Sequence, residues 1–153
     1  MIARPTTEQI ARDCARELLD TVLPAVQGEA AAVGVRMLDN VLRNIAVRAA
    51  HEIAWMTEET AAMEAYARDL LTAMPQAAGV EEALAAVDGA PRAGLHLDDV
   101  VETYTRAGEA FALAMEAAVE EGDVALTRRA RELLDLRSGH EVEAMADWSP
   151  IGR

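Results

Sequence analysis

A polar face between residues 36 and 51 carries the side chains best suited to binding chemistry. If this segment is helical, 100° per residue places five of them within a sector of roughly 100°, opposite an apolar stripe. They are Arg36, Asn40, Arg43, Asn44 and His51. Arg36 and Asn40 are one turn apart, and a guanidinium with an amide offers several donors to a carboxylate, a phosphate or a backbone carbonyl. The alternative for this face is an ordinary solvated helix surface.

Arg48 and Glu52 lie nearer the apolar stripe and have the spacing of a salt bridge on a helix. A partly buried pair is the simplest interpretation, although Arg48 could also extend the binding surface. The candidate partner-binding residues are Arg36, Asn40, Arg43 and Arg48.

Histidine-based metal chemistry has little support in the spacing. The residues three positions before His51 and His140 are Arg48 and Arg137, so the Glu-x-x-His pattern of helical carboxylate sites is missing. His51, His96 and His140 could still converge from three segments as a three-histidine site with an open water position. A metal-dependent enzyme is therefore a third-ranked hypothesis, and we expect no metal and no cofactor.

Nucleophilic and phosphoryl-transfer chemistry lack their usual residues. All fourteen basic residues are arginine, so the chain cannot supply a phosphate-binding lysine or a Schiff base. Neither Ser138 nor Ser149 lies in a Gly-x-Ser-x-Gly sequence. The single cysteine, Cys14, falls on an apolar helix stripe and is expected in the core. We expect that the chain does not catalyse a reaction by itself.

One local basic cluster lies further along the chain. It consists of Arg128, Arg129, Arg131 and Arg137, with Glu132 and Asp135 interspersed. Such a cluster could bind a phosphorylated ligand, but in an acidic chain pairing with neighbouring helices is the commoner outcome.

Composition and charge limit the fold and the partners. The 153 residues are 52% hydrophobic and only 3% aromatic, and their abundant Ala, Leu, Met, Glu and Arg favour helices. A net charge of −13 argues against holding nucleic-acid phosphates. The longest charge-free run, residues 70–80, is too short for a membrane span. Without a signal-like start or paired cysteines, we expect a cytoplasmic protein without membrane or nucleic-acid partners.

Periodicity and cap residues predict an all-α fold, a single-domain bundle (residues 1–153) of about five main helices. Thr6 and Gln9 have capping-box spacing for a first helix that Pro24 limits. The second expected helix spans residues 29–56, and the third begins at a Thr57 cap and ends near residue 74. The fourth begins at Asp98 or Asp99 and ends at Gly122. The fifth begins at an Asp123 cap and ends at about Arg137, because Ser138-Gly139 follows. A last turn is expected around 142–148, before Pro150. Residues 75–97 are expected to form a loop-rich connection with a short helical piece at 81–87.

The expected core faces follow the large apolar residues. In the first expected helix they are Ile10, Cys14, Leu18 and Val22, widened by Ala11, Ala15 and Leu19, and in the second they are Leu38, Val41, Leu42, Ile45 and Ala49. In the third they are Met63, Tyr66, Leu70 and Leu71, and in the fourth Val101, Tyr104, Gly108, Phe111, Met115 and Val119. Charge is unevenly placed, because residues 1–56 sum to −1 and the remainder to −12. The first two expected helices are thus nearly neutral and could face a partner.

Several short motifs in the first 50 residues resemble a known family. They are Arg4-Pro5-Thr6, Glu17-Leu18-Leu19, Val22-Leu23-Pro24-Ala25, Gly28, Arg36-x-x-x-Asn40 and Ile45-x-x-Arg48. Together they resemble an uncharacterised family of small bacterial helical proteins encoded beside aminoglycoside-phosphotransferase-like kinases and acyl-CoA dehydrogenases. The segment that runs from Glu109-Ala110-Phe111 to Gly122-Asp123, and the sequence Trp148-Ser149-Pro150, fit the family pattern more loosely. The chain departs from the family pattern at Ala49-Ala50, where an acidic residue is commoner, and in its long 75–97 connection.

The resemblance implies an accessory role. The expected function is a non-catalytic subunit that binds a kinase-like enzyme encoded nearby, which phosphorylates hydroxyacyl-CoA or a related hydroxylated substrate. The runner-up is a homodimeric helical bundle that binds a small apolar or acyl ligand between Met- and Ala-lined helices. Self-association as a homo-oligomer is expected in either case, since thin alanine-rich helices need extensive packing.

Overall fold

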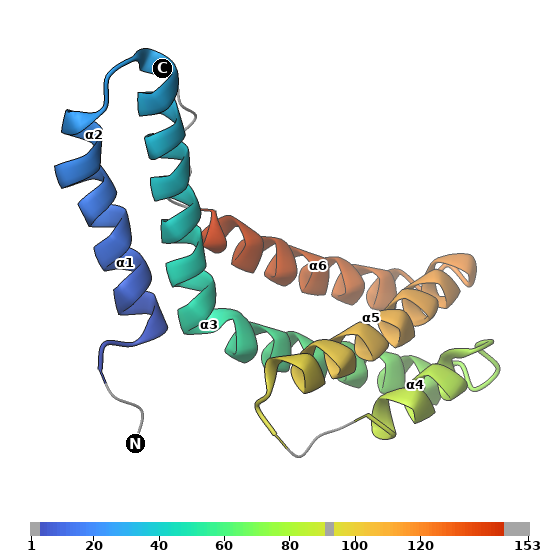
Figure 1. The fold of residues 1–153 in the computed structure, drawn as a ribbon. Coiled ribbons are helices and arrows are strands. Elements are labelled where there is room, and N and C mark those ends of the chain that lie inside the picture. Colours follow the sequence, from blue (N-terminus) through green and yellow to red (C-terminus); the bar gives the residue numbers. More distant parts are fainter. Residues whose placement is uncertain (1–3, 91–93, 146–153) are drawn as a thin grey trace. The chain divides into compact units, whose positions relative to one another are not determined.

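The computed structural model describes residues 4–90 and 94–145, and its regular elements there are all helical (Figure 1). The all-α expectation is confirmed. In chain order the elements are α1 (Thr7–Glu17), η1 (Leu18–Val22), α2 (Leu23–Ala25), α3 (Glu29–Ala73), α4 (Val80–Asp88), α5 (Leu97–Glu120) and α6 (Val124–Ala144). Among the described residues, no helix combines the length and the apolar character that crossing a membrane requires.

The chain divides into two compact units. The first contains the chain up to Glu52 and from His140 onward, and the second is Ile53–Gly139. Both α3 and α6 contribute to each unit. That the whole chain is one domain stays a prediction.

In the first unit, α1 packs antiparallel to the beginning of α3 (Figure 1). The expected capping box at its start is confirmed, since the Gln9 amide donates to Thr6 Oγ1 at 3.3 Å and the Thr6 amide to Gln9 Oε1 at 2.9 Å. The helical path continues past Pro24 to Ala25 through the wider turn η1, in which the Leu23 amide donates to Leu18 O. A wider turn relieves the clash between a proline ring and the preceding carbonyl.

The core faces predicted for this unit are only partly correct. In α1 the predicted Ala11 and Ala15 are buried, whereas the predicted Ile10 and Cys14 are exposed. In the first part of α3 the buried residues are Val35, Asp39 and Ala46. The expected core residues Leu38, Val41, Ile45 and Ala49 are exposed, and Leu42 is half-buried. The physical reason is that two helices approach most closely across alanine, so the bulky side chains lie on other faces.

A helix break at Thr57 is also contradicted, because α3 continues through it. The Thr57 hydroxyl donates to Ile53 O at 2.7 Å, a bond within the helix rather than a cap. Residues 29–73 therefore form one helix where two were expected.

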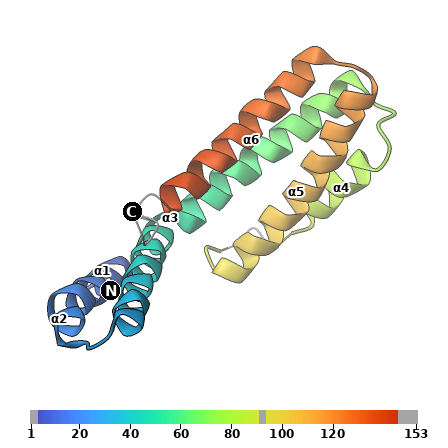
Figure 2. The same ribbon diagram turned by 90° about the horizontal axis from the view of Figure 1, so that it is seen from above.

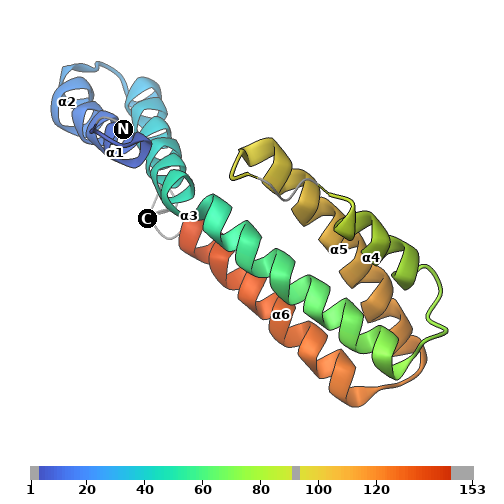
Figure 3. The ribbon, with the colours of Figure 1, turned by 90° about the horizontal axis from the view of Figure 1, so that it is seen from below.

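In the second unit, α6 runs antiparallel to the latter part of α3, and α4 lies beside α5 (Figures 2 and 3). The core joins Met63, Tyr66 and Leu70 of α3, as predicted, to residues of the other three helices. These are Val80, Leu84 and Val87 of α4; Ala107, Ala110, Phe111, Ala114 and Ala118 of α5; and Leu126 and Ala130 of α6. The Tyr66 and Phe111 rings meet edge to face, with centroids 5.2 Å apart.

Alanine again displaces the residues predicted for the core of α5. Phe111 is buried as expected, but Val101 and Val119 are exposed and four alanines take the inner face. The caps are confirmed: Gly122 has a φ of 71°, which favours glycine, and Asp123 Oδ1 accepts from the Leu126 amide at 2.9 Å. The short helix expected at 81–87 is present as α4, although Pro91 in the same connection lies outside the described residues.

The predicted end of the last helix at Ser138-Gly139 is wrong, because α6 continues to Ala144. One interior glycine costs about 1 kcal/mol, and the last turn gains a hydrogen bond from Asn44 Nδ2 to Ala144 O at 2.9 Å. Val142 belongs to this helix, whereas Trp148 and Pro150 of the expected last turn lie outside the described residues.

Because the helices pack closely at buried alanines, a larger side chain there should lower the free energy of unfolding, whereas the same change at an exposed alanine should not. Ala110→Leu should lower the free energy of unfolding by about 1–3 kcal/mol, since Ala110 is fully buried among three helices and has no space for an isobutyl group. Ala112→Leu, on the exposed side of the same helix, is the matched control and should change stability by less than about 0.5 kcal/mol. Urea denaturation followed by circular dichroism measures both. Equal effects would contradict the assigned packing face.

Candidate functional site

Arg43, one of the four candidate partner-binding residues, is held in an internal ion pair. Its Nε lies 3.0 and 3.1 Å from the two carboxylate oxygens of Asp39, which is only 6% exposed. The pair adjoins a shallow cavity of about 260 Å³ lined partly by Ala15 and Leu19. A buried carboxylate needs such a partner, so Arg43 has a structural role.

Arg48 connects α3 to the end of α6 in the first unit. Its Nε donates to Asn44 Oδ1 at 3.2 Å, and its other nitrogens lie 3.4 Å from Glu52 and 3.6 Å from Glu141. The predicted Arg48–Glu52 pair is thus present. Asn44 completes the junction through its bond to the Ala144 carbonyl.

Arg36 and Asn40 remain available on α3. Arg36 is exposed and Asn40 half-buried, and Arg36 makes no ion pair within the described part of the chain. The four candidates therefore do not form one surface. Two of them stabilise the unit, whereas Arg36 is exposed and Asn40 half-buried.

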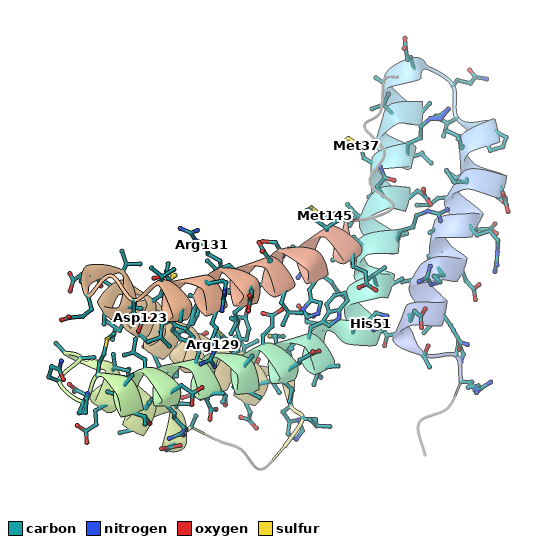
Figure 4. The ribbon with its side chains drawn as sticks, turned by 180° about the vertical axis from the view of Figure 1, so that it is seen from behind. Met37, His51, Asp123, Arg129, Arg131 and Met145 are labelled. Atoms are coloured by element: carbon teal, nitrogen blue, oxygen red, sulfur yellow. The ribbon has the colours of Figure 1, made fainter. Side chains whose placement is uncertain are left out.

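A second surface on α3 combines Met37 with Leu38, Val41 and Ile45, which sequence reasoning assigned to the core. Met37, Leu38, Val41 and Ile45 are 51%, 55%, 44% and 44% exposed, and these four residues are called the apolar stripe below. Met37 extends from α3 on the side away from α1, and Met145 at the end of α6 points to the same side (Figure 4). The stripe could be recognised as apolar from sequence, but its exposure could not.

The second unit contains a polar cluster that sequence reasoning missed. The Tyr104 hydroxyl donates to Glu59 Oε2 at 2.6 Å and accepts from Arg137 Nε at 3.1 Å, and that Nε lies 3.4 Å from the same Glu59 oxygen. Glu59 is only 5% exposed. The Arg137 guanidinium also lies 5.5 Å from the centroid of the Tyr104 ring.

This cluster links α3, α5 and α6 through charge-assisted hydrogen bonds. Burial raises the pKa of Tyr104, and the hydrogen bond to the Glu59 carboxylate raises this pKa further. Tyr104 is 45 positions from Glu59 and 33 from Arg137, so no local motif could have revealed the cluster.

Tyr66 presents the opposite situation. Its hydroxyl is buried without a hydrogen-bond partner among the described residues. Burial raises the pKa of Tyr66, while the nearby Arg129 charge lowers it and Asp123 raises it. Burying a hydroxyl without a hydrogen bond lowers the free energy of unfolding.

The basic cluster of α6 is largely paired internally. Arg129 lies 2.7 Å from Asp69, Arg128 3.8 Å from Glu132, and Arg137 belongs to the cluster around Glu59. Arg131 points away from α3, whereas Arg129 lies on the side facing it (Figure 4). The cluster therefore does not converge on one ligand.

The three histidines do not form a recognised metal site. His51 and His140 belong to the first unit and His96 to the second. No group of three or more His, Cys, Asp or Glu side chains suited to a metal ion occurs in residues 4–90 and 94–145.

An open surface cavity of about 300 Å³ lies in the second unit between α3, α5 and the residues before α5. Its lining includes Ala61, Leu95, Val100 and the partly buried Glu64. The hydroxyls of two of its threonines bond to helix carbonyls, from Thr57 to Ile53 and from Thr103 to Asp99. Binding of a small apolar ligand stays a prediction.

Comparisons of this chain with protein-family models, with curated proteins and with solved structures found no match.

The two tyrosines predict opposite outcomes for the same substitution. Tyr104→Phe should lower the free energy of unfolding by about 1.5–3 kcal/mol, because the buried Glu59 carboxylate loses a donor. Tyr66→Phe is the matched control and should leave stability unchanged or raise it, since the deleted hydroxyl has no partner in the described structure. Chemical denaturation at pH 7 measures both. A larger loss in Tyr66→Phe would contradict these assignments.

The same tyrosines predict a loss of stability in alkali. Folding raises the pKa of both tyrosines. The free energy of unfolding is therefore unaffected by their ionisation below the unfolded pKa, near pH 10, and falls as pH rises from there through the higher folded pKa. The free energy of unfolding should therefore fall above about pH 10. Because these are the chain's only two tyrosines, the Tyr66→Phe/Tyr104→Phe double variant should show a shallower fall. Identical slopes would refute the alkaline contribution.

Proposed function

We propose that this chain is a non-catalytic accessory subunit that acts by binding other proteins through its first unit. The observation that carries the proposal is that α1 covers only one side of α3 there. The large apolar side chains of the stripe and the Arg36–Asn40 pair lie on other sides, exposed or half-buried. Exposed apolar surface gathered on one helix face is typical of an interaction site.

The proposed partner is an aminoglycoside-phosphotransferase-like kinase that acts on hydroxyacyl-CoA or a related hydroxylated substrate. This choice comes from the resemblance of the motifs between Arg4 and Arg48, and from the lack of lysine in the chain. The kinase would supply the chemistry, and this subunit would supply surface contacts.

Arg36 and Asn40 are the proposed contacts with the kinase. Arg36 is exposed in a chain with 27 acidic residues and still makes no ion pair in the described region, so its guanidinium can meet a carboxylate of a partner. Asn40, one turn away, adds an amide that can donate and accept. Arg43 and Arg48 act indirectly, by holding Asp39 and the end of α6.

Co-expression with the kinase encoded beside it tests this function. The two chains should co-elute, and Arg36→Ala/Asn40→Ala should weaken binding at least about tenfold, a loss typical of interface arginines. Arg128→Ala, at an exposed arginine of the second unit, is the control and should bind normally. Calorimetry of the purified pair measures the affinities. No binding, with kinase activity unchanged when the subunit is added, would refute the proposal.

A further inference from the structure

We infer that the apolar stripe of α3 is the contact surface for a second copy of this chain, packed as an antiparallel helix pair. This inference goes beyond the proposed function. It uses a face of α3 different from that of Arg36 and Asn40, and it needs no kinase.

The spacing along the stripe is that of a helix–helix seam. Gly34, Leu38, Val41 and Ile45 alternate steps of four and three residues, and the same steps continue to Arg48 and Glu52. Alternation of three and four residues keeps one side of a helix against a neighbouring helix. Within this unit α1 packs against another side of α3, where Val35, Asp39 and Ala46 are buried.

Gly34 leaves space on the stripe for the close approach of another helix. It lies in the interior of α3 at the angular centre of the stripe, has no positive φ, and an added Cβ would meet nothing within 4 Å. A helix loses about 1 kcal/mol with glycine in place of alanine. Close packing of another backbone against this position would offset the cost.

The seam is complementary to itself when reversed. Its beginning is small, at Gly34, and its end is large, at Arg48 and Glu52, with Val41 midway. In an antiparallel pair with two-fold symmetry, Val41 meets its own copy, and Ile45 of one helix lies near Leu38 of the other. A parallel pair would place bulky residues beside bulky residues.

The available area is appropriate for a small dimer. The exposed parts of the four stripe residues amount to about 350 Å² of apolar surface, which is within the range of functional patches. Met145 extends it on the same side (Figure 4). A standard interface buries about 800 Å² per partner, of which about 65% is apolar in homodimers, so this surface supplies most of what is needed.

Charge favours association through this unit. Residues of the first unit sum to −3 and those of the second to −10. Two acidic copies repel each other least where the local charge is smallest, and repulsion in the acidic unit opposes pairing there. A second copy can therefore approach along the first unit with little electrostatic cost.

Sedimentation velocity of the full chain between about 5 and 200 μM tests the inference, a range that detects micromolar dimers. The wild-type chain should be dimeric at the upper end. Val41→Glu should raise the dimer dissociation constant at least about 100-fold, because two carboxylates would face each other in an apolar contact. The control, Val119→Glu, changes a valine that is 57% exposed in the second unit and should dimerise like the wild type.

Gly34→Leu provides a second variant that does not rely on added charge. It should weaken the dimer while circular dichroism shows unchanged or higher helicity, since leucine favours the helix more than glycine does. The inference is overturned if the wild type is monomeric at 200 μM, or if Val41→Glu and Gly34→Leu dimerise normally. A monomer that Val41→Glu destabilises would mean that the chain's own remaining residues cover the stripe, which also overturns it. Arg36→Ala/Asn40→Ala should remain dimeric, so loss of kinase binding and loss of dimerisation are distinguished.

Discussion

Close approach of helices across alanine is the constraint on which the rest of the structure depends. Ala11 and Ala15 are the buried residues of α1, Ala46 is buried in the first part of α3, and four alanines are buried in α5. Small side chains bring helix axes closer together, which improves backbone packing but provides little apolar area per residue. Larger apolar residues are then left beside the contact or outside it, and the stripe on α3 is the clearest result.

The buried charges fit the same constraint. Asp39 and Glu59 lie in helix contacts that are otherwise lined by small or apolar residues, and each is compensated by an arginine. An arginine can reach such a carboxylate from the edge of the contact while the rest of its side chain covers apolar surface. The Asp39–Arg43 pair lies within α3, whereas the contacts of Glu59 make the helix arrangement specific, because shifting α5 or α6 along α3 would leave this buried carboxylate without its donors.

The sequence predicted the helical class and the local caps correctly, but it did not predict which faces of the helices are buried. Thr6, Asp123 and Gly122 act as expected because capping depends on residues a few positions apart. Hydrophobic periodicity selected Leu38, Val41 and Val119 for the core because it weighs large side chains above alanine, whereas packing distance favoured alanine. The continuity of α3 through Thr57 and of α6 through Gly139 depends on tertiary contacts, as does the Glu59–Tyr104–Arg137 cluster, and no local pattern encodes them.

The first unit exposes its larger apolar residues on α3, and we propose that other chains bind them there. Isotope-filtered NMR on a mixture of methyl-labelled and unlabelled protein tests this most directly, because it detects only contacts between different copies. The account predicts intermolecular signals at the methyl groups of Leu38, Val41 and Ile45, and none at Val119. Absence of intermolecular signals from the stripe at high concentration, or their appearance only at Val119, would contradict it.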